Sequence, residues 1–134
     1  MFLPFPKATL LVPSGPSHDP DRKHLFIVLT KPDAAHNLLI AGVASIPHQS
    51  NHDKACELAR GEHAFLRHPS YVRFRGAHIV AAQSLIDSVS AGLMVVREPI
   101  SDTTMERVIG ELQKSLFVSP KIRQYFSLQM QREL

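Results

Sequence analysis

The sequence contains a single cysteine, Cys56, among 134 residues. One cysteine excludes an internal disulfide, and it also excludes a metal site built from several thiolates. A nucleophilic role would need a histidine partner, and His52 is a neighbour only along the chain. We therefore interpret Cys56 as a small, half-buried apolar residue.

Long apolar runs are also missing, because no stretch approaches the ~18 residues that a membrane span requires. The first six residues are apolar, but Pro4 and Pro6 interrupt them. This segment lacks the basic start and the long apolar core of a signal peptide. We therefore expect no membrane partner and a cytoplasmic location.

Acidic residues are absent from a long internal stretch. The whole chain carries a formal net charge of +3, yet residues 63–86 contain no Asp or Glu. The basic side chains of this stretch are His63, Arg67, His68, Arg73, Arg75 and His78. Such a stretch predicts a locally positive surface that can meet phosphate groups.

The apolar content, 44% of residues, is sufficient for one core, so we expect one domain over residues 1–134. Short β-branched and aromatic runs between proline, glycine and polar segments predict strands. These runs are residues 7–12, 24–30, 38–46, 70–74, 78–82, 85–89 and 92–96. Residues 54–60 fit either a strand, which we favour slightly, or a short helix ended by Gly61. A long polar loop at residues 13–23 has the length typical of functional loops.

The clearest alternation lies in residues 70–74. Val72 and Phe74 are expected on one face of a strand, and Tyr71, Arg73 and Arg75 on the other. This pattern predicts a half-exposed strand with a cationic and aromatic face, which Gly76 should interrupt.

The C-terminal third changes to a helical period, with apolar residues that include Met105, Val108 and Leu112. We expect a helix over residues 103–117, with residues 103–106 as its capping box. Ser119 and Pro120 then begin a second helix. The order of elements predicts an α+β fold: a strongly bent antiparallel sheet of five or more strands, closed by C-terminal helices.

Three segments together carry a resemblance. They are KATLLVPSGPSHDPDRKHLFIVL, LLIAGVASIP and GLMVVREPISDTTMERVIGELQKSL. In order and pattern they resemble the MazF/PemK toxins, a family that includes Kid and shares an SH3-like barrel with the gyrase poison CcdB. The resemblance covers residues 7–116 and implies an SH3-like barrel, a homodimer, an antitoxin protein as partner and cleavage of single-stranded RNA without a metal. Phe2, Phe5, Phe126 and Leu128 are the apolar residues expected to supply the dimer contact.

The resemblance also implies site residues. The family has a basic residue after the first loop, which corresponds to Arg22 or Lys23. Its hydroxyl residue at the end of the next strand corresponds to Ser45, and a histidine of the first loop corresponds to His18. His48 follows Ser45 by three residues and is expected to face the same site. An acidic residue that Kid uses on a later strand has no counterpart here, where the sequence reads GAHIVAAQ.

Cleavage of RNA without a metal uses the 2′-hydroxyl of the substrate as the nucleophile. The enzyme must remove that proton, protonate the leaving oxygen and stabilise the charge on phosphorus. We assign proton transfer to His18 and His48, phosphate binding to Arg22 and positioning to Ser45. The residues expected to bind RNA are Lys23, Arg67, Tyr71, Arg73 and Arg75. We expect no cofactor and no metal, because the pair His48 and His52 lacks an evident third ligand.

The rival hypothesis is a non-catalytic module that binds a protein, as the gyrase poison does on the same fold, because a fold does not determine function. Convergence of Arg22, Ser45 and His48 on one pocket would favour the enzyme, and separate faces would favour the module.

Overall fold

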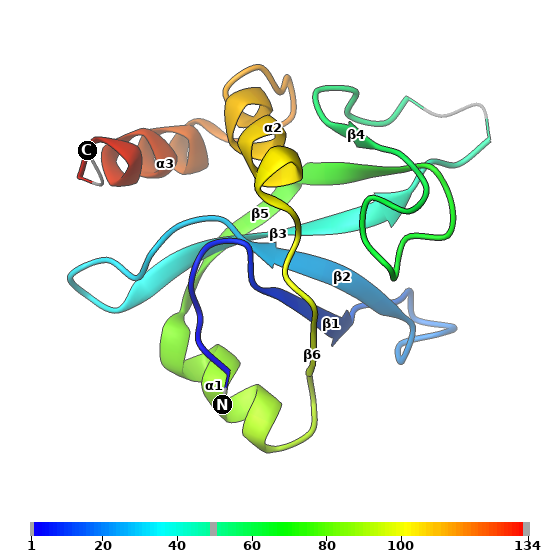
Figure 1. Ribbon diagram of the computed structural model, residues 1–134, viewed down its shortest axis with the longest axis horizontal. Coiled ribbons are helices and arrows are strands. Elements are labelled where there is room, and N and C mark those ends of the chain that lie inside the picture. Colours follow the sequence, from blue (N-terminus) through cyan, green and yellow to red (C-terminus); the bar gives the residue numbers. More distant parts are fainter. Residues whose placement is uncertain (1, 49–50, 133–134) are drawn as a thin grey trace.

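The computed structural model describes residues 2–48 and 51–132. It is an α+β structure in which an antiparallel sheet curls into a half-barrel, with helices on both of its faces (Figure 1). The strand order across the sheet is β4-β5-β3-β2-β1-β6. The strands are β1 Thr9–Pro13, β2 Lys23–Val28, β3 Asn37–Ser45, β4 Glu57–Leu58, β5 Ser70–Ala81 and β6 Val95–Arg97. The helices are α1 Ala82–Ser90, α2 Asp102–Leu112 and α3 Pro120–Arg132. The predicted α+β class and the bent antiparallel sheet of at least five strands are confirmed.

One face of the sheet carries the main core. Alternate residues of β2, β3 and β5, such as Ile27, Leu39 and Phe74, are fully buried there. They pack against the apolar stripes of α2 and α3, which include Val108 and Phe126. The apolar side chains that recur every second residue in the strands and at helical spacing in the helices therefore form one core layer.

The opposite face is covered over only part of its area. There α1 and the N-terminal segment pack on large residues of the sheet (Figure 1). This second cluster consists of Leu10, Val28, Leu38, Ile40, Ala82 and Leu85. Towards the C-terminal end of β3, the same face carries Gly42 and Ala44 instead, and it remains open.

The predicted interruption at Gly76 is a bulge within one long strand. Ile40 of β3 pairs with His78 of β5, whereas Gly42 pairs with Arg73, so five residue steps on β5 oppose two on β3. Bulges of this kind bend a strand and redirect its side chains. The strand continues beyond the bulge, so the predicted run 70–74 and residues 78–81 of the predicted run 78–82 are parts of the same β5, and Ala82 begins α1.

Residues 85–89, predicted as a strand, belong to α1, and this prediction was wrong. Ala82 and Leu85 are spaced by three and are both buried against the sheet. A short apolar run fits either period, and here the packing on the sheet decides for the helix. In residues 54–60, only the two residues of β4 pair with β5.

The helix boundaries also differ from those predicted. Ser101 caps α2 by accepting a hydrogen bond from the Thr104 amide at 3.1 Å, so the capping residue is not Thr103. This helix ends at Leu112, five residues before the predicted end. Ser119 accepts a hydrogen bond from the Ile122 amide at the start of α3.

Two further expectations about surfaces were wrong. Phe126 was expected at a dimer contact, but it lies in the core with 3% exposure. His63 was counted in the positive surface, yet it is also buried. Phe5 and Leu128 are each 49% exposed. Within residues 2–48 and 51–132, no helix is both long and apolar enough to cross a membrane.

Candidate nucleic-acid interface

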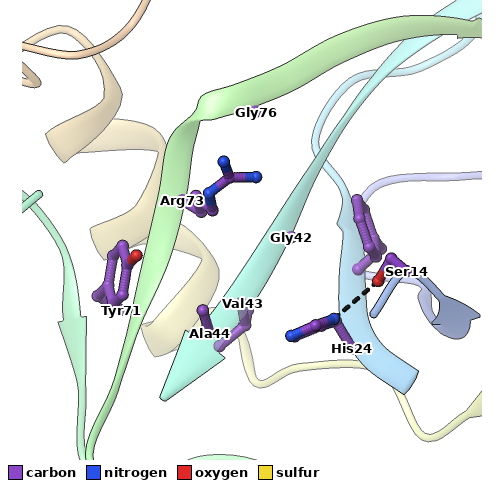
Figure 2. Close-up of a pocket in the computed structure, with 9 residues that line it drawn as sticks. Ser14, His24, Gly42, Val43, Ala44, Tyr71, Arg73 and Gly76 are labelled. Carbon is purple, nitrogen blue, oxygen red and sulfur yellow. Dashed lines mark hydrogen bonds between the residues drawn. The ribbon is translucent and has the colours of Figure 1, made fainter. Parts of the chain in front are cut away.

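The open part of the second face forms a trough of about 310 Å³ (Figure 2). Its sides come from β2 and β5, and β3 runs between them as the floor. Gly42 is central to this floor because it pairs with Phe26 on one side and with Arg73 on the other. The Phe26 ring lies against it so closely that a Cβ at Gly42 would be 3.0 Å from the ring. Gly42 therefore lets the Phe26 ring lie against the middle strand, and both residues line the trough.

His24 stands on the β2 side of the trough. Its Nδ1 is 2.7 Å from the Ser14 Oγ, and the Ser14 hydroxyl donates to the Val12 carbonyl at 3.1 Å. A carbonyl only accepts, so both bonds form together when His24 carries its proton on Nδ1 and donates it to Ser14. The second ring nitrogen, Nε2, is then the acceptor, and it points away from Ser14 towards β3 (Figure 2).

The pKa of His24 is lowered from its usual value, first by burial and then by the positive charges of Arg22 and Arg73. A lowered pKa keeps the imidazole neutral at neutral pH. A neutral imidazole with a free Nε2 lone pair is the form that a general base requires. Its cationic neighbours are the groups that would hold a phosphate beside it.

Arg73 faces the trough from β5, on the opposite side from His24 (Figure 2). Its guanidinium packs against the bulge, because a Cβ at Gly76 would lie 2.9 Å from Nη1. The predicted alternation is confirmed, since Val72 and Phe74 are buried with 0% exposure while Arg73 and Arg75 are exposed.

A larger cleft of about 650 Å³ adjoins the trough and shares His24, Val43 and Ala44 with it. The basic residues that line the cleft are Arg22, Lys23, His24, Arg67, His68 and Arg97. No Asp or Glu occurs among the described residues that line the cleft or the trough. The two cavities therefore form one cation-rich surface suited to a polyanion.

The outer wall of the cleft is a loop that His63 holds in place. The His63 Nδ1 accepts a hydrogen bond from the Phe65 amide at 3.0 Å, and Nε2 lies 2.6 Å from the Glu98 carbonyl. Arg97 lies over the Phe65 ring at 5.6 Å from its centroid. His63 thus ties the loop to the segment after β6, which is a structural role.

The structure brings four of the sequence-predicted residues to the cleft: Arg22, Lys23, Ser45 and Arg67. Tyr71 and Arg73 line the adjoining trough. Arg75 lines a third, smaller hollow, which shares Tyr71 and Arg73 with the trough.

His18 and His48 are exposed and are not among the residues that line these three cavities. Convergence of Arg22, Ser45 and His48 on one pocket was expected to favour the enzyme over the protein-binding module. Arg22 and Ser45 share the cleft, but His48 is not among the residues that line it.

Sequence reasoning missed three residues of this surface, Ser14, His24 and Arg97, and it named His68 only as part of the positive stretch, without a role in catalysis. A signal for His24 was present, because it alternates with Leu25 and Ile27 and so shares a face with Phe26. Nothing local in the sequence indicates that this face of β2 lies across β3 from Arg73.

Cys56 is a poor candidate for chemistry. It is buried with 2% exposure, and burial raises the pKa of its thiol to about 11. A thiol with that pKa is protonated at neutral pH and is a weak nucleophile. In the described part of the chain, no three side chains of His, Cys, Asp or Glu are grouped so that they could hold a metal ion.

Comparison of the chain with models of known protein families and with curated proteins found no match.

Proposed function

We propose that this protein is a metal-independent endoribonuclease that cleaves single-stranded RNA by attack of the substrate's own 2′-hydroxyl. The observation that carries the proposal is the position of His24. Ser14 fixes its tautomer, burial and then the neighbouring cations lower its pKa, and it stands where two cation-rich cavities meet. This combination provides a base and phosphate ligands in one place.

The proposed chemistry begins at His24. Its Nε2 takes the proton of the 2′-hydroxyl, and the resulting oxygen attacks the adjacent phosphorus. Arg22 and Arg73 stabilise the charge that develops on the phosphate oxygens. The bond from phosphorus to the 5′-oxygen breaks, and His68 in the same cleft supplies the proton that this oxygen takes up. The products are a 2′,3′-cyclic phosphate and a 5′-hydroxyl.

The remaining cations guide and hold the strand. Lys23, Arg67 and Arg97 line the cleft and attract phosphates along the chain. Tyr71 lies in the trough and offers an aromatic ring to a base. Bases are free to stack on a side chain only where they are unpaired, so the substrate is single-stranded RNA.

The wider proposal follows the resemblance to MazF/PemK toxins. It includes an SH3-like form of the half-barrel, a toxin role held in check by an antitoxin protein, a homodimer and a cytoplasmic location. The curled antiparallel sheet and the shared cleft of Arg22 and Ser45 support it. Phe5 and Leu128 remain as exposed apolar residues for a dimer contact.

The test is incubation of the pure protein with mixed RNA in a chelator, followed by analysis of the product ends. His24→Ala and Arg22→Ala should each slow cleavage by about 100-fold or more, while RNA binding weakens far less. His18→Ala and His48→Ala are the matched histidine controls and should retain activity. Cleavage that requires magnesium, or loss of activity only in the control variants, would overturn this assignment.

The alternative is a module that binds a protein without catalysis. An observation that favours it is the apolar character of β6 and of the short segment before it, at one edge of the sheet. Leu93, Val95 and Val96 are 65%, 42% and 43% exposed. An added strand from a partner commonly pairs with such an edge. RNA left intact by the pure protein, together with stable binding of a cellular protein, would favour this function.

A further inference from the structure

The third hollow, of about 160 Å³, adjoins the trough at Tyr71 and Arg73. It is the smallest of the three connected cavities on this surface. Its size therefore suits one side group of a bound polymer better than the polymer's backbone. We propose that this hollow binds a single nucleobase of the RNA, that of a nucleotide next to the phosphate held by Arg73. The inference rests on the proposed function for its substrate, and it adds a site that selects the base.

One wall of the hollow is a cation on an aromatic ring. The guanidinium carbon of Arg75 lies 4.7 Å from the centroid of the Phe117 ring. Phe117 follows α2 and reaches β5 from a different part of the chain, so it fixes the position of an otherwise exposed arginine. Guanidinium planes and aromatic rings are the groups on which unpaired bases stack.

A second wall is built from two rings. The His52 ring lies 5.0 Å from the Tyr71 ring, centroid to centroid, at 46°. His52 is itself held by Glu57, with 2.5 Å between Nε2 and the carboxylate. Its side chain is only 7% exposed, so Tyr71 rests on a rigid support. A base that enters the hollow therefore meets aromatic groups that are already ordered, which lowers the entropic cost of binding.

Charge also favours a nucleotide. Arg73 and Arg75 line the hollow. One acid, Asp53, lines it too, but its carboxylate is engaged, since it accepts hydrogen bonds from the Ser115 hydroxyl and the Ala55 amide. A phosphate in the trough and a base in the hollow are thus bridged by Arg73 and Tyr71, which line both cavities.

A first experiment does not depend on cleavage. Wild-type protein is titrated with each of the four nucleoside 5′-monophosphates, and two-dimensional NMR follows the aromatic resonances. We expect shifts at Tyr71, His52 and Phe117, whereas ribose 5-phosphate should leave them unchanged. Phe117→Ala should weaken nucleotide binding by about tenfold, the loss typical of one stacked base. Leu116→Ala is the matched control, because Leu116 is 93% exposed and does not line the hollow.

A second experiment uses a randomised RNA and reads the base preference beside the cut. Phe117→Ala and Arg75→Lys, which keeps the charge but loses the plane, should flatten that preference at one position. If cleavage proceeds and neither variant changes the preference or the NMR shifts, the base site is refuted and the nuclease stands. If nucleotides bind the hollow while RNA is never cut, the base site stands and the nuclease is refuted.

Discussion

Replacing Gly76 with alanine tests whether Arg73 holds the RNA backbone from its observed position. The added Cβ would lie 2.9 Å from the Arg73 Nη1, which is closer than unbonded atoms approach, and 3.6 Å from Cζ, which is an ordinary contact. The atom that must move is the far end of a flexible side chain. The substitution therefore displaces the guanidinium and leaves the strand in place.

The effect on stability should be small and of known sign. Gly76 has no positive φ, so alanine fits its backbone. A compatible change from glycine to alanine usually stabilises a protein by about 0.4–1 kcal/mol, because it restricts the unfolded chain. We expect a free energy of unfolding within about 1 kcal/mol of the wild-type value. Gly110→Ala is the control, since nothing lies within 4 Å of its added Cβ, and it should stabilise α2 by about 1 kcal/mol.

The effect on RNA binding should appear in its salt dependence. Loss of one phosphate contact to single-stranded RNA makes the slope of log K against log salt shallower by about 0.7. Between 50 and 200 mM salt, the affinity ratio of wild type to variant should thus shrink by about threefold. Titration with RNA methylated at its 2′-hydroxyls measures binding without cleavage.

Arg73→Ala should show the same shallower slope as Gly76→Ala, and Gly110→Ala should retain the wild-type slope. If Arg73→Ala also retains the wild-type slope, Arg73 does not contact the backbone and the proposed trough is not an RNA site. If only Gly76→Ala retains it, the guanidinium binds from a position other than the one beside the bulge.

Three further predictions concern proton transfer and the support of the site. Because the pKa of His24 is lowered, the cleavage rate of the wild-type protein should decrease only when the pH falls below the ordinary histidine pKa of about 6.5. In a pH–rate profile of Arg73→Ala, this decrease should begin at a higher pH. His68→Ala should slow cleavage of ordinary RNA but not of RNA with sulfur in place of the leaving 5′-oxygen, since a thiolate leaves without a proton; slow cleavage of both substrates would remove His68 from the acid role. Arg107 donates hydrogen bonds to both carboxylate oxygens of Glu62 at 2.7 and 2.9 Å, and this lowers the pKa of Glu62. The pair therefore stabilises the fold fully above the ordinary carboxyl pKa, and this stability is lost as the pH falls through the lowered pKa of Glu62. Arg107→Met should cost about 1 kcal/mol at pH 7 by chemical denaturation, and this cost should shrink as the pH falls below the lowered Glu62 pKa; a cost that does not change with pH would contradict an ionic cause.

Local periodicity was sufficient to predict most strands of this sheet. The alternation around Val72 and Phe74 correctly separated the core face of β5 from the face of Tyr71 and Arg73, because the period of two depends only on neighbouring residues. The same reasoning failed for residues 85–89, where Leu85 is buried by a helix that lies on the sheet. A run of five residues does not distinguish these two ways of burying an apolar side chain.

Strand order is the feature that the sequence pattern could not supply. In the sheet, β3 lies between β2 and β5, so residues far apart in sequence face one another across it. His24 and Arg73 meet in the trough for this reason, and no local motif contains both. The prediction therefore included Arg22 and Ser45, whose segments adjoin the cleft. It chose His18 from the family resemblance and His48 from its closeness to Ser45 in the sequence, and neither source contains the strand order.

The location of the trough follows from a change of residue size along one strand. On the same face of β3, Leu38 and Ile40 are buried under the cluster that includes Leu85, and the next two positions are Gly42 and Ala44. Large residues give α1 a surface to pack on, and small ones give it none. The covered area therefore ends where the side chains of β3 become small, and there Arg73 of β5 and His24 of β2 line the open trough. The sequence LIAGVA thus defines both where the second core stops and where a ligand can approach the sheet.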